Sequence, residues 1–175
     1  SGLDSFLEQV FEKGWVEDGR ISTSSLELKE LWSWRENISE SIEAKGFVRK
    51  NDISVPVSKL AHFYKDLMTL LEKSSKNMEV LLFGHVGDGN IHINYTSSHF
   101  KNFEDFAGEA QRIERDVFSL IQKYRGSISA EHGVGLLKKD DLHFTRTKEE
   151  VTYMKHIKKI FDPHCILNPG KIFDP

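Results

Sequence analysis

Apolar side chains recur every three or four residues in several stretches of the chain, which is the spacing of an amphipathic helix. In the longest stretch, from Phe103 to Tyr124, the side chains of Phe106, Ile113 and Val117 share one stripe. Glycine or proline follows three of these stretches and marks where each helix should end. The pattern predicts helices over residues 5–13, from 22–25 to about 44, from 56 to about 71, over 103–124 and over 148–161.

Shorter stretches alternate between apolar and polar positions, which is typical of half-buried strands. They predict a strand over residues 47–55, two strands joined by a turn within 78–95, and a short strand over 127–131 that ends at Gly133. Residues 164–175 are expected to form an extended tail. Long helices mixed with antiparallel strands indicate the α+β class rather than a doubly wound parallel sheet.

The hairpin predicted within residues 78–95 carries the first candidate chemistry. Asp88-Gly89 is a typical two-residue hairpin turn, because both residue types tolerate positive φ. A turn there would place His85 directly opposite His92, with Cβ atoms about 4.5–5.5 Å apart, and two imidazoles so placed can bind one metal ion. The alternation would put Phe83, His85, His92 and Asn94 on a polar face, and Leu82, Val86, Ile91, Ile93 and Tyr95 on the core face. An ordinary hairpin with two surface histidines is the alternative.

A second candidate motif runs from Ser129 to Gly135. Glu131 in this motif can complete a His/His/Glu set, which suits Zn²⁺ or a similar divalent ion with open positions for substrate. Adjacent residues of a strand point to opposite faces, so Glu131 and His132 can both enter one site only if the chain turns at the following glycines. The alternative is a capping glutamate and a surface histidine before a glycine turn.

Composition narrows the class of protein. The 175 residues carry 24 Lys and Arg against 27 Asp and Glu, a net charge of −3, which argues against a general nucleic-acid-binding protein. No apolar run approaches the ~20 residues of a membrane helix. The single thiol, Cys165, excludes an internal disulfide framework and favours a reducing compartment: the cytoplasm, or the mitochondrial matrix in a eukaryote. By themselves, the charged run 138–141 and Arg35 indicate solvated surface.

Three motifs in order along the chain together resemble one family. They are the hairpin residues 84–92, the run 129–135, and the segment from Phe161 to Lys171. This combination is similar to the FAD-linked oxidases with a vanillyl-alcohol-oxidase-type fold, most of all to the D-2-hydroxyglutarate and D-lactate dehydrogenases and the glycolate oxidase D subunit. The resemblance covers nearly the whole chain.

The resemblance implies that residues 1–175 are the C-terminal substrate- and metal-binding domain of such an enzyme. The expected fold is a ferredoxin-like antiparallel sheet with helices packed on one face. The FAD-binding half normally precedes this one, and the chain begins with Ser1 rather than Met, which agrees with that expectation.

The resemblance also implies a set of ligands and a base. His85, His92 and Glu131 would bind a divalent metal, Zn²⁺ being expected first. His132 would accept the proton of the substrate hydroxyl, because a neutral imidazole is a suitable base near neutral pH. The reaction would oxidise a small D-2-hydroxy acid, such as 2-hydroxyglutarate, lactate or glycolate, to the 2-oxo acid, with hydride transfer to FAD.

The family pattern further assigns binding residues and partners. Arg35, Ser39 and Lys50 would bind substrate carboxylate, with Ser39 where close members usually have threonine. Asn94 would line the site near substrate and flavin, and Asn168 would contact the cofactor. The expected partners are the FAD-binding domain of the same polypeptide, an electron acceptor and a second copy in a homodimer. A stand-alone zinc hydrolase and a small-acid sensor domain are the alternatives, and a flavin-binding region directly upstream in the gene would argue against both.

Overall fold

The computed structural model describes residues 2–174, so the predictions at the two end residues, Ser1 and Pro175, lie outside the described part. The chain divides into two compact units, one up to Ser41 and one from Ile42 onward. Within the described residues, no helix combines the length and the apolar character needed to cross a membrane.

The first unit is helical. It contains α1 (Gly2–Glu12), α2 (Ser25–Glu36) and the start of α3 (Ile38–Glu43). The N-cap of α2 is Ser24, inside the predicted range, and its hydroxyl accepts the backbone N–H of Glu27 at 3.2 Å. The single helix predicted to about residue 44 is wrong, because Asn37 adopts φ −88° and ψ 6° and separates α2 from α3. That bridge conformation interrupts the regular helical turn.

An antiparallel sheet of three strands forms the centre of the second unit. Its strands are β1 (Phe47–Ser54), β2 (Glu79–His85) and β3 (Asn90–Ser97). They lie in the order β1-β3-β2, with β3 in the middle. Since β1 and β2 both pair antiparallel with β3, they run parallel to each other and need a crossover connection.

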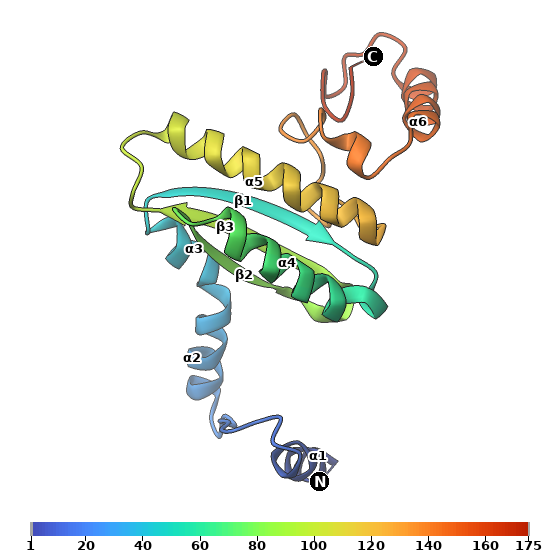
Figure 1. Ribbon diagram of the computed structural model, residues 1–175. Coiled ribbons are helices and arrows are strands. Elements are labelled where there is room, and N and C mark those ends of the chain that lie inside the picture. The colour runs from blue at the N-terminus through green and yellow to red at the C-terminus, as the bar shows by residue number, and fades with distance from the viewer. Residues whose placement is uncertain (1, 175) are drawn as a thin grey trace. The chain divides into compact units, whose positions relative to one another are not determined.

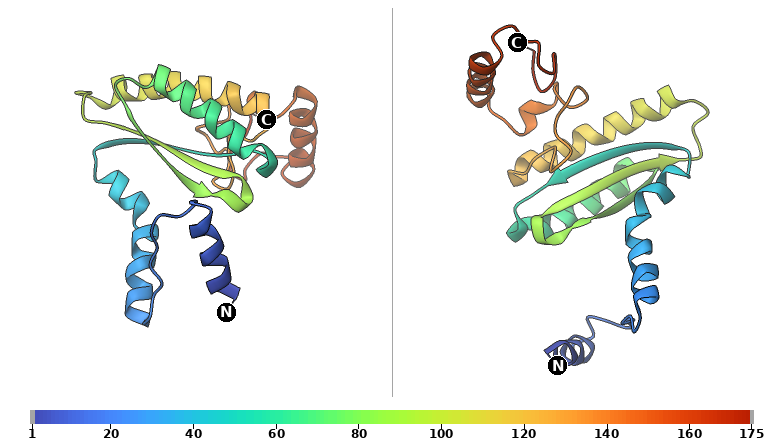
Figure 2. Two further views of the ribbon diagram at one scale, coloured as in Figure 1. Left: turned by 60° about the horizontal axis from the view of Figure 1, so that its bottom comes forward. Right: turned by 180° about the vertical axis from the view of Figure 1, so that it is seen from behind.

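Two long helices cover one face of this sheet, as Figures 1 and 2 show. The crossover from β1 to β2 consists of a short 3₁₀ turn (Val57–Lys59) and α4 (Leu60–Ser74), and β3 leads into α5 (Phe103–Tyr124). The α5 bounds agree with the sequence prediction. The order β-α-β-β-α is that of a ferredoxin-like fold, and it confirms the α+β class.

The strand predicted over residues 127–131 is wrong. Only one antiparallel bridge forms there, between Ser127 and Ser54 at the outer edge of β1, where a ferredoxin-like sheet has its fourth strand. Beyond it, the N–H groups of Ala130, Glu131 and His132 all point to one oxygen of Asp52. Successive N–H groups of a strand point to opposite sides, so this convergence requires a bent backbone instead.

The core lies between the sheet and the two long helices. Apolar side chains of alternating strand positions meet the apolar stripes of α4 and α5, as the helical and strand patterns predict. The fully buried members include Ile53, Ile93, Tyr95, Phe63, Leu67, Phe106, Ile113, Val117 and Ile121. The opposite face of the sheet therefore carries the polar alternate positions.

The C-terminal part of the second unit contains a short 3₁₀ turn (Leu142–Phe144) and α6 (Lys148–Phe161), and α6 has its predicted bounds. The extended tail predicted after it is wrong. Residues 164–174 form successive turns, with positive φ at Cys165 and Asn168 among others. The buried carboxylate of Asp162 holds this segment, as it accepts two of its backbone N–H groups, each at 3.0 Å.

Candidate active site

The hairpin between β2 and β3 has a different register from the predicted one. Phe83 pairs with His92, and His85 pairs with Asn90, so the direct opposition of His85 and His92 is wrong. The reason is the turn: a 3₁₀ turn (Val86–Asp88) and a left-handed Gly89 connect the strands, in place of a two-residue turn. Val86, predicted on the core face, is accordingly exposed.

The register differs by two residues, an even number, so each side chain keeps its predicted face. Phe83, His85 and His92 still share the face away from the helices. The ring centroids of His85 and His92 lie 5.7 Å apart in an edge-to-face arrangement, and those of Phe83 and His92 lie 5.0 Å apart. The two histidines are thus diagonal neighbours rather than opposed ones.

The bend after Ser127 brings Glu131 and His132 to this same face. Gly133 follows with φ +79°, a conformation that glycine adopts without strain. Oε1 of Glu131 lies 3.5 Å from Nε2 of His92. The ring of His132 stacks on that of His92, with centroids 5.6 Å apart. Because the backbone is bent here, two adjacent residues reach one cluster, which a regular strand would prevent.

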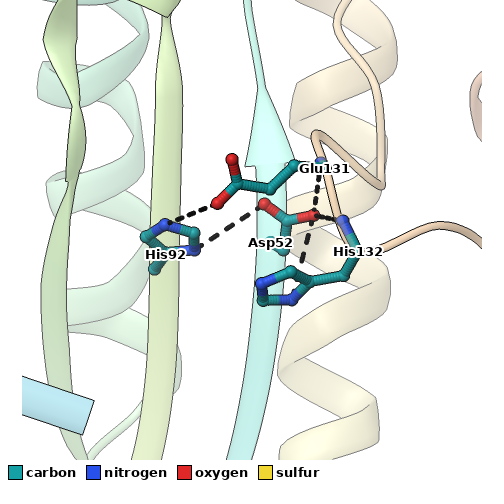
Figure 3. Close-up of side chains that lie close together, drawn as sticks. All are labelled: Asp52, His92, Glu131 and His132. Carbon is teal, nitrogen blue, oxygen red and sulfur yellow. Dashed lines mark hydrogen bonds and ion pairs between the residues drawn. The ribbon is translucent and has the colours of Figure 1, made fainter.

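Asp52 is the member of this cluster that sequence reasoning missed. It pairs directly with His92 across β1 and β3, and only 1% of the residue is exposed. Its Oδ2 accepts the backbone N–H groups of Ala130, Glu131 and His132 at 2.8–2.9 Å, as Figure 3 shows for the last two. A signal was present in the sequence, because aspartate is depleted from strand interiors and needs a reason to occupy one.

Burial and the neighbouring polar groups shift the pKa of Asp52 in opposite directions, and the same is true of the pKa of His92. Burial works to raise the pKa of Asp52, but the backbone N–H groups of His132 and Glu131 outweigh it and hold the pKa below its usual value. Burial lowers the pKa of His92, against the opposing attraction of the Asp52 and Glu131 carboxylates. The cluster therefore combines an ionised aspartate with a neutral imidazole near neutral pH.

Lys138 is half-buried beside the cluster, so the prediction that it lies on the solvated surface is wrong. Its ammonium group donates to the backbone carbonyl of Ile128 at 2.6 Å and to that of Asp52 at 3.2 Å. Burial lowers the pKa of Lys138, while the nearby Asp52 carboxylate opposes that shift. These bonds join β1 to the bent segment that carries Glu131 and His132.

The next rung of the sheet pairs two further predicted residues, Lys50 and Asn94. Asn94 is buried, and its amide donates to the carbonyl of Leu81 at 3.4 Å. Lys50 is exposed, and its ammonium group lies 2.5 Å from a carboxylate oxygen of Glu43. Both residues therefore lie on the same face of the sheet as His92, two positions along the strands.

Three predicted residues lie in other parts of the chain. Arg35 and Ser39 belong to the first unit, where the guanidinium of Arg35 lies 5.5 Å from the ring centroid of Trp32. Asn168 lies in the C-terminal turns, and its side-chain oxygen accepts a hydrogen bond from Lys171 at 2.9 Å. Their roles toward substrate and cofactor stay predictions.

The donor set fits a divalent metal ion. Among the described residues, Asp52, His92, Glu131 and His132 each offer a ligand atom, and these atoms all lie within 4.8 Å of one another. Imidazole nitrogen and carboxylate oxygen are ligands that Zn²⁺ accepts. The side chains of Glu131 and His132 are 46% and 61% exposed, so the cluster is open on one side. His85 lies outside this group but contacts the His92 ring.

Comparison with known proteins assigns the class. The family described as FAD linked oxidases, C-terminal domain, matches residues 3–172. The chain therefore belongs to this family, and the predicted resemblance is confirmed.

Individual relatives are similar over nearly all of this chain. The D-2-hydroxyglutarate dehydrogenase of Stutzerimonas stutzeri (strain A1501) is 45% identical over 95% of it. The D-2-hydroxyglutarate dehydrogenase of Xanthomonas citri pv. viticola is 41% identical over 96% of it, and the mitochondrial one of Danio rerio is 41% identical over 97%. The chain spans 36%, 35% and 30% of these three proteins, about a third of their length.

Proposed function

We propose that this chain is the substrate-binding part of an FAD-dependent oxidoreductase that converts a small D-2-hydroxy acid to the 2-oxo acid. D-2-hydroxyglutarate is the first candidate substrate, because relatives named for it match nearly the whole chain. The observation that carries the proposal is an exposed imidazole beside a pair of potential metal ligands. His92 and Glu131 face each other at 3.5 Å, and the ring of His132 stacks on that of His92.

His85, His92 and Glu131 are the residues proposed to hold a divalent metal. The facing atoms of His92 and Glu131 support two of these ligands, and the ring contact between the two histidines supports the third. When bound, the metal would act as a Lewis acid that lowers the pKa of the substrate hydroxyl. The exposed side of Glu131 leaves room for substrate oxygens.

His132 is proposed as the base that accepts the hydroxyl proton. Its side chain is the most exposed of the cluster, and its ring lies against that of His92, so it faces the open side where a substrate would enter. A histidine needs no unusual environment to accept a proton near neutral pH. A bound flavin would supply the acceptor for the hydride from C2 of the substrate.

Substrate carboxylate is proposed to bind Lys50, with Arg35 and Ser39 as further contacts. Lys50 lies on the same sheet face as the cluster, and its present partner is the exposed Glu43, which a substrate carboxylate can replace. The side-chain amide of Asn94 would contribute to the floor of the site near substrate and flavin, and Asn168 would contact the cofactor.

The proposal includes partners and a compartment. The chain would work with an FAD-binding domain of the same polypeptide and with an electron acceptor, and two copies would form a homodimer. The cytoplasm, or the mitochondrial matrix in a eukaryote, is the proposed location, in keeping with the single free thiol.

Anaerobic flavin reduction in the flavoprotein that contains this chain tests the proposal. D-2-hydroxyglutarate, D-lactate and glycolate are offered in turn, with L-2-hydroxyglutarate as the control. We expect flavin bleaching with at least one of the three acids, loss of bleaching after chelation, and recovery with zinc. If none of the acids bleaches the flavin, the proposed reaction is wrong, and saturable acid binding without reduction would favour a sensor.

A further inference from the structure

We propose that Asp52 is a positioning residue whose two carboxylate oxygens hold the two halves of the metal site in register. Oδ2 fixes the segment that carries Glu131 and His132, and Oδ1 fixes the orientation and the tautomer of His92. This inference rests on the metal site of the proposed function and goes beyond it, because Asp52 is neither a proposed ligand nor the proposed base.

The role of Oδ2 follows from three backbone N–H groups that donate to it. Oδ2 accepts the N–H groups of Ala130, Glu131 and His132 at 2.9, 2.8 and 2.8 Å. Three successive N–H groups around an anion form a nest, and hydrogen bonds to an ionised acceptor are about twice as strong as neutral ones. The carboxylate on β1 thereby fixes the backbone of the two residues whose side chains enter the cluster.

The role of the other oxygen, Oδ1, follows from its surroundings: it is buried and has no hydrogen-bond partner among residues 2–174. It lies 3.6 Å from Nδ1 of His92, on the directly paired position of β3. A small rotation of the imidazole would make this a hydrogen bond, and an ionised carboxylate can only accept one. The proton of a neutral His92 would then lie on Nδ1.

A metal bound by both Glu131 and His92 requires this tautomer of His92, with the proton on Nδ1. Nε2 of His92 faces Oε1 of Glu131 at 3.5 Å, so the metal-binding lone pair must lie on Nε2. A carboxylate on the far nitrogen of a metal-binding histidine orients the ring and strengthens the ligand, and its loss costs typically 10–100-fold in metal affinity. The order Asp52, His92, Glu131 has the geometry of such an arrangement.

A direct ligand role for Asp52 fits the structure less well. The carboxylate is 1% exposed, and Oδ2 already has three donors, which a metal would have to displace. Oδ1 lies next to Nδ1 of His92, whereas Glu131 faces the other ring nitrogen, Nε2. Lys138 donates to the backbone carbonyl of Asp52, not to its carboxylate. Asp52 thus acts through its neighbours.

Zinc affinity of the purified chain, measured by competition with a chelator, tests the inference. Asp52→Asn keeps the size of the side chain but removes its charge and places an NH₂ group on one side. The matched control is Asp162→Asn, because Asp162 is also buried and also accepts backbone N–H groups of a turn, yet the side-chain contacts of Asp162 within residues 2–174 are Lys158, Ile166 and Leu167 and include no histidine. We expect Asp52→Asn to weaken zinc binding at least tenfold, and Asp162→Asn to leave it within twofold.

A second readout needs no variant. Nitrogen shifts of His92 in the zinc-free wild-type chain, recorded at mildly alkaline pH, report which ring nitrogen carries the proton, and we expect Nδ1. A proton on Nε2, or equal zinc affinities of Asp52→Asn and Asp162→Asn, overturns the inference while the proposed function stands. If the wild-type chain binds no zinc at all, the metal site of the proposed function is wrong, and the positioning role toward a metal is overturned with it.

Discussion

Nε2 of His92 lies 3.5 Å from Oε1 of Glu131, although one residue belongs to the central strand β3 and the other to a bent segment at the edge of the sheet. The histidine side chain is 11% exposed and the glutamate side chain 46% exposed. One donor is therefore fixed in the sheet while the other faces the open side. Such a pair leaves room for a ligand to complete the coordination of a bound ion.

Removal of either proposed histidine ligand should weaken zinc binding. We expect His92→Ala and His85→Ala each to lower the zinc affinity of the chain at least tenfold, because each deletes a nitrogen donor. Competition with a chelator measures the affinity. His62→Ala is the control, since His62 is an exposed residue of α4, on the helical side of the sheet. Unchanged affinity in the His85 variant would leave His85 as a neighbour of the site rather than a ligand.

Replacement of His132 should separate proton transfer from metal binding. In the flavoprotein that contains this chain, we expect His132→Asn to keep metal and flavin but to lower kcat by ~10²–10⁴-fold, the usual effect of losing a general base. Metal content, flavin spectrum and the rate of flavin reduction are measured on one preparation. Loss of metal together with activity would show that His132 is a ligand and that another group is the base.

The proposed carboxylate-binding cations should act on substrate affinity. Arg35→Ala and Lys50→Ala are each expected to lower kcat/KM for a 2-hydroxy acid about tenfold or more, because a charge-assisted hydrogen bond contributes roughly 1.5–3 kcal/mol. Steady-state kinetics of the flavoprotein measure the change. Lys29→Ala, an exposed position of the same helix as Arg35, serves as the control. Equal kinetics of the Arg35 and Lys29 variants would assign Arg35 to the surface.

Flavin binding should require more than this chain. The chain spans about a third of the length of the relatives named above, and the proposed function places the FAD-binding domain outside it. We therefore expect the purified 175-residue chain, mixed with FAD and desalted, to be colourless. An absorbance spectrum decides the matter, and stoichiometric flavin in the desalted sample would contradict the prediction.

The stability of the C-terminal turns should depend on pH through Asp162. The ammonium of Lys158, followed by the backbone N–H groups of Leu167 and Ile166, holds the pKa of Asp162 below its usual value despite burial. A lowered pKa means that this stabilisation is complete above the pKa of the unfolded chain and is lost as the pH falls through the folded value. Asp162→Asn should therefore reduce the free energy of unfolding at neutral pH and less so in acid.

Urea denaturation of the wild-type chain and of this variant at several pH values measures that difference. Asp116→Asn is the control, because Asp116 is an exposed residue of α5 whose ion pair with Arg112 spans 3.7 Å. A difference between the wild-type and Asp162→Asn chains that stays constant with pH would contradict the prediction.

Local patterns in the sequence determined most of the helices and the faces of the strands. The bounds of α5 and α6, the strand β1 and the shared face of His85, His92 and Asn94 followed from periodicity alone. Even the wrong hairpin register kept these faces, because an error of two residues leaves the alternation unchanged. Within such segments the period of the pattern indicates which face each side chain takes.

Tertiary structure decided the features that depend on distant residues. Asp52 accepts backbone N–H groups 78, 79 and 80 positions away, and those bonds turn the predicted fourth strand into a bend. Lys138, part of a charged run in the sequence, is half-buried and donates to the backbone carbonyls of Asp52 and Ile128. The periodicity of a sequence does not predict contacts between residues so far apart along the chain. It shows only which face of a helix or strand a residue takes, and not which distant residues pack against that face. The sequence thus determined which residues face the site, and only the packing of β1 against β3 and the bent segment decided how they act together.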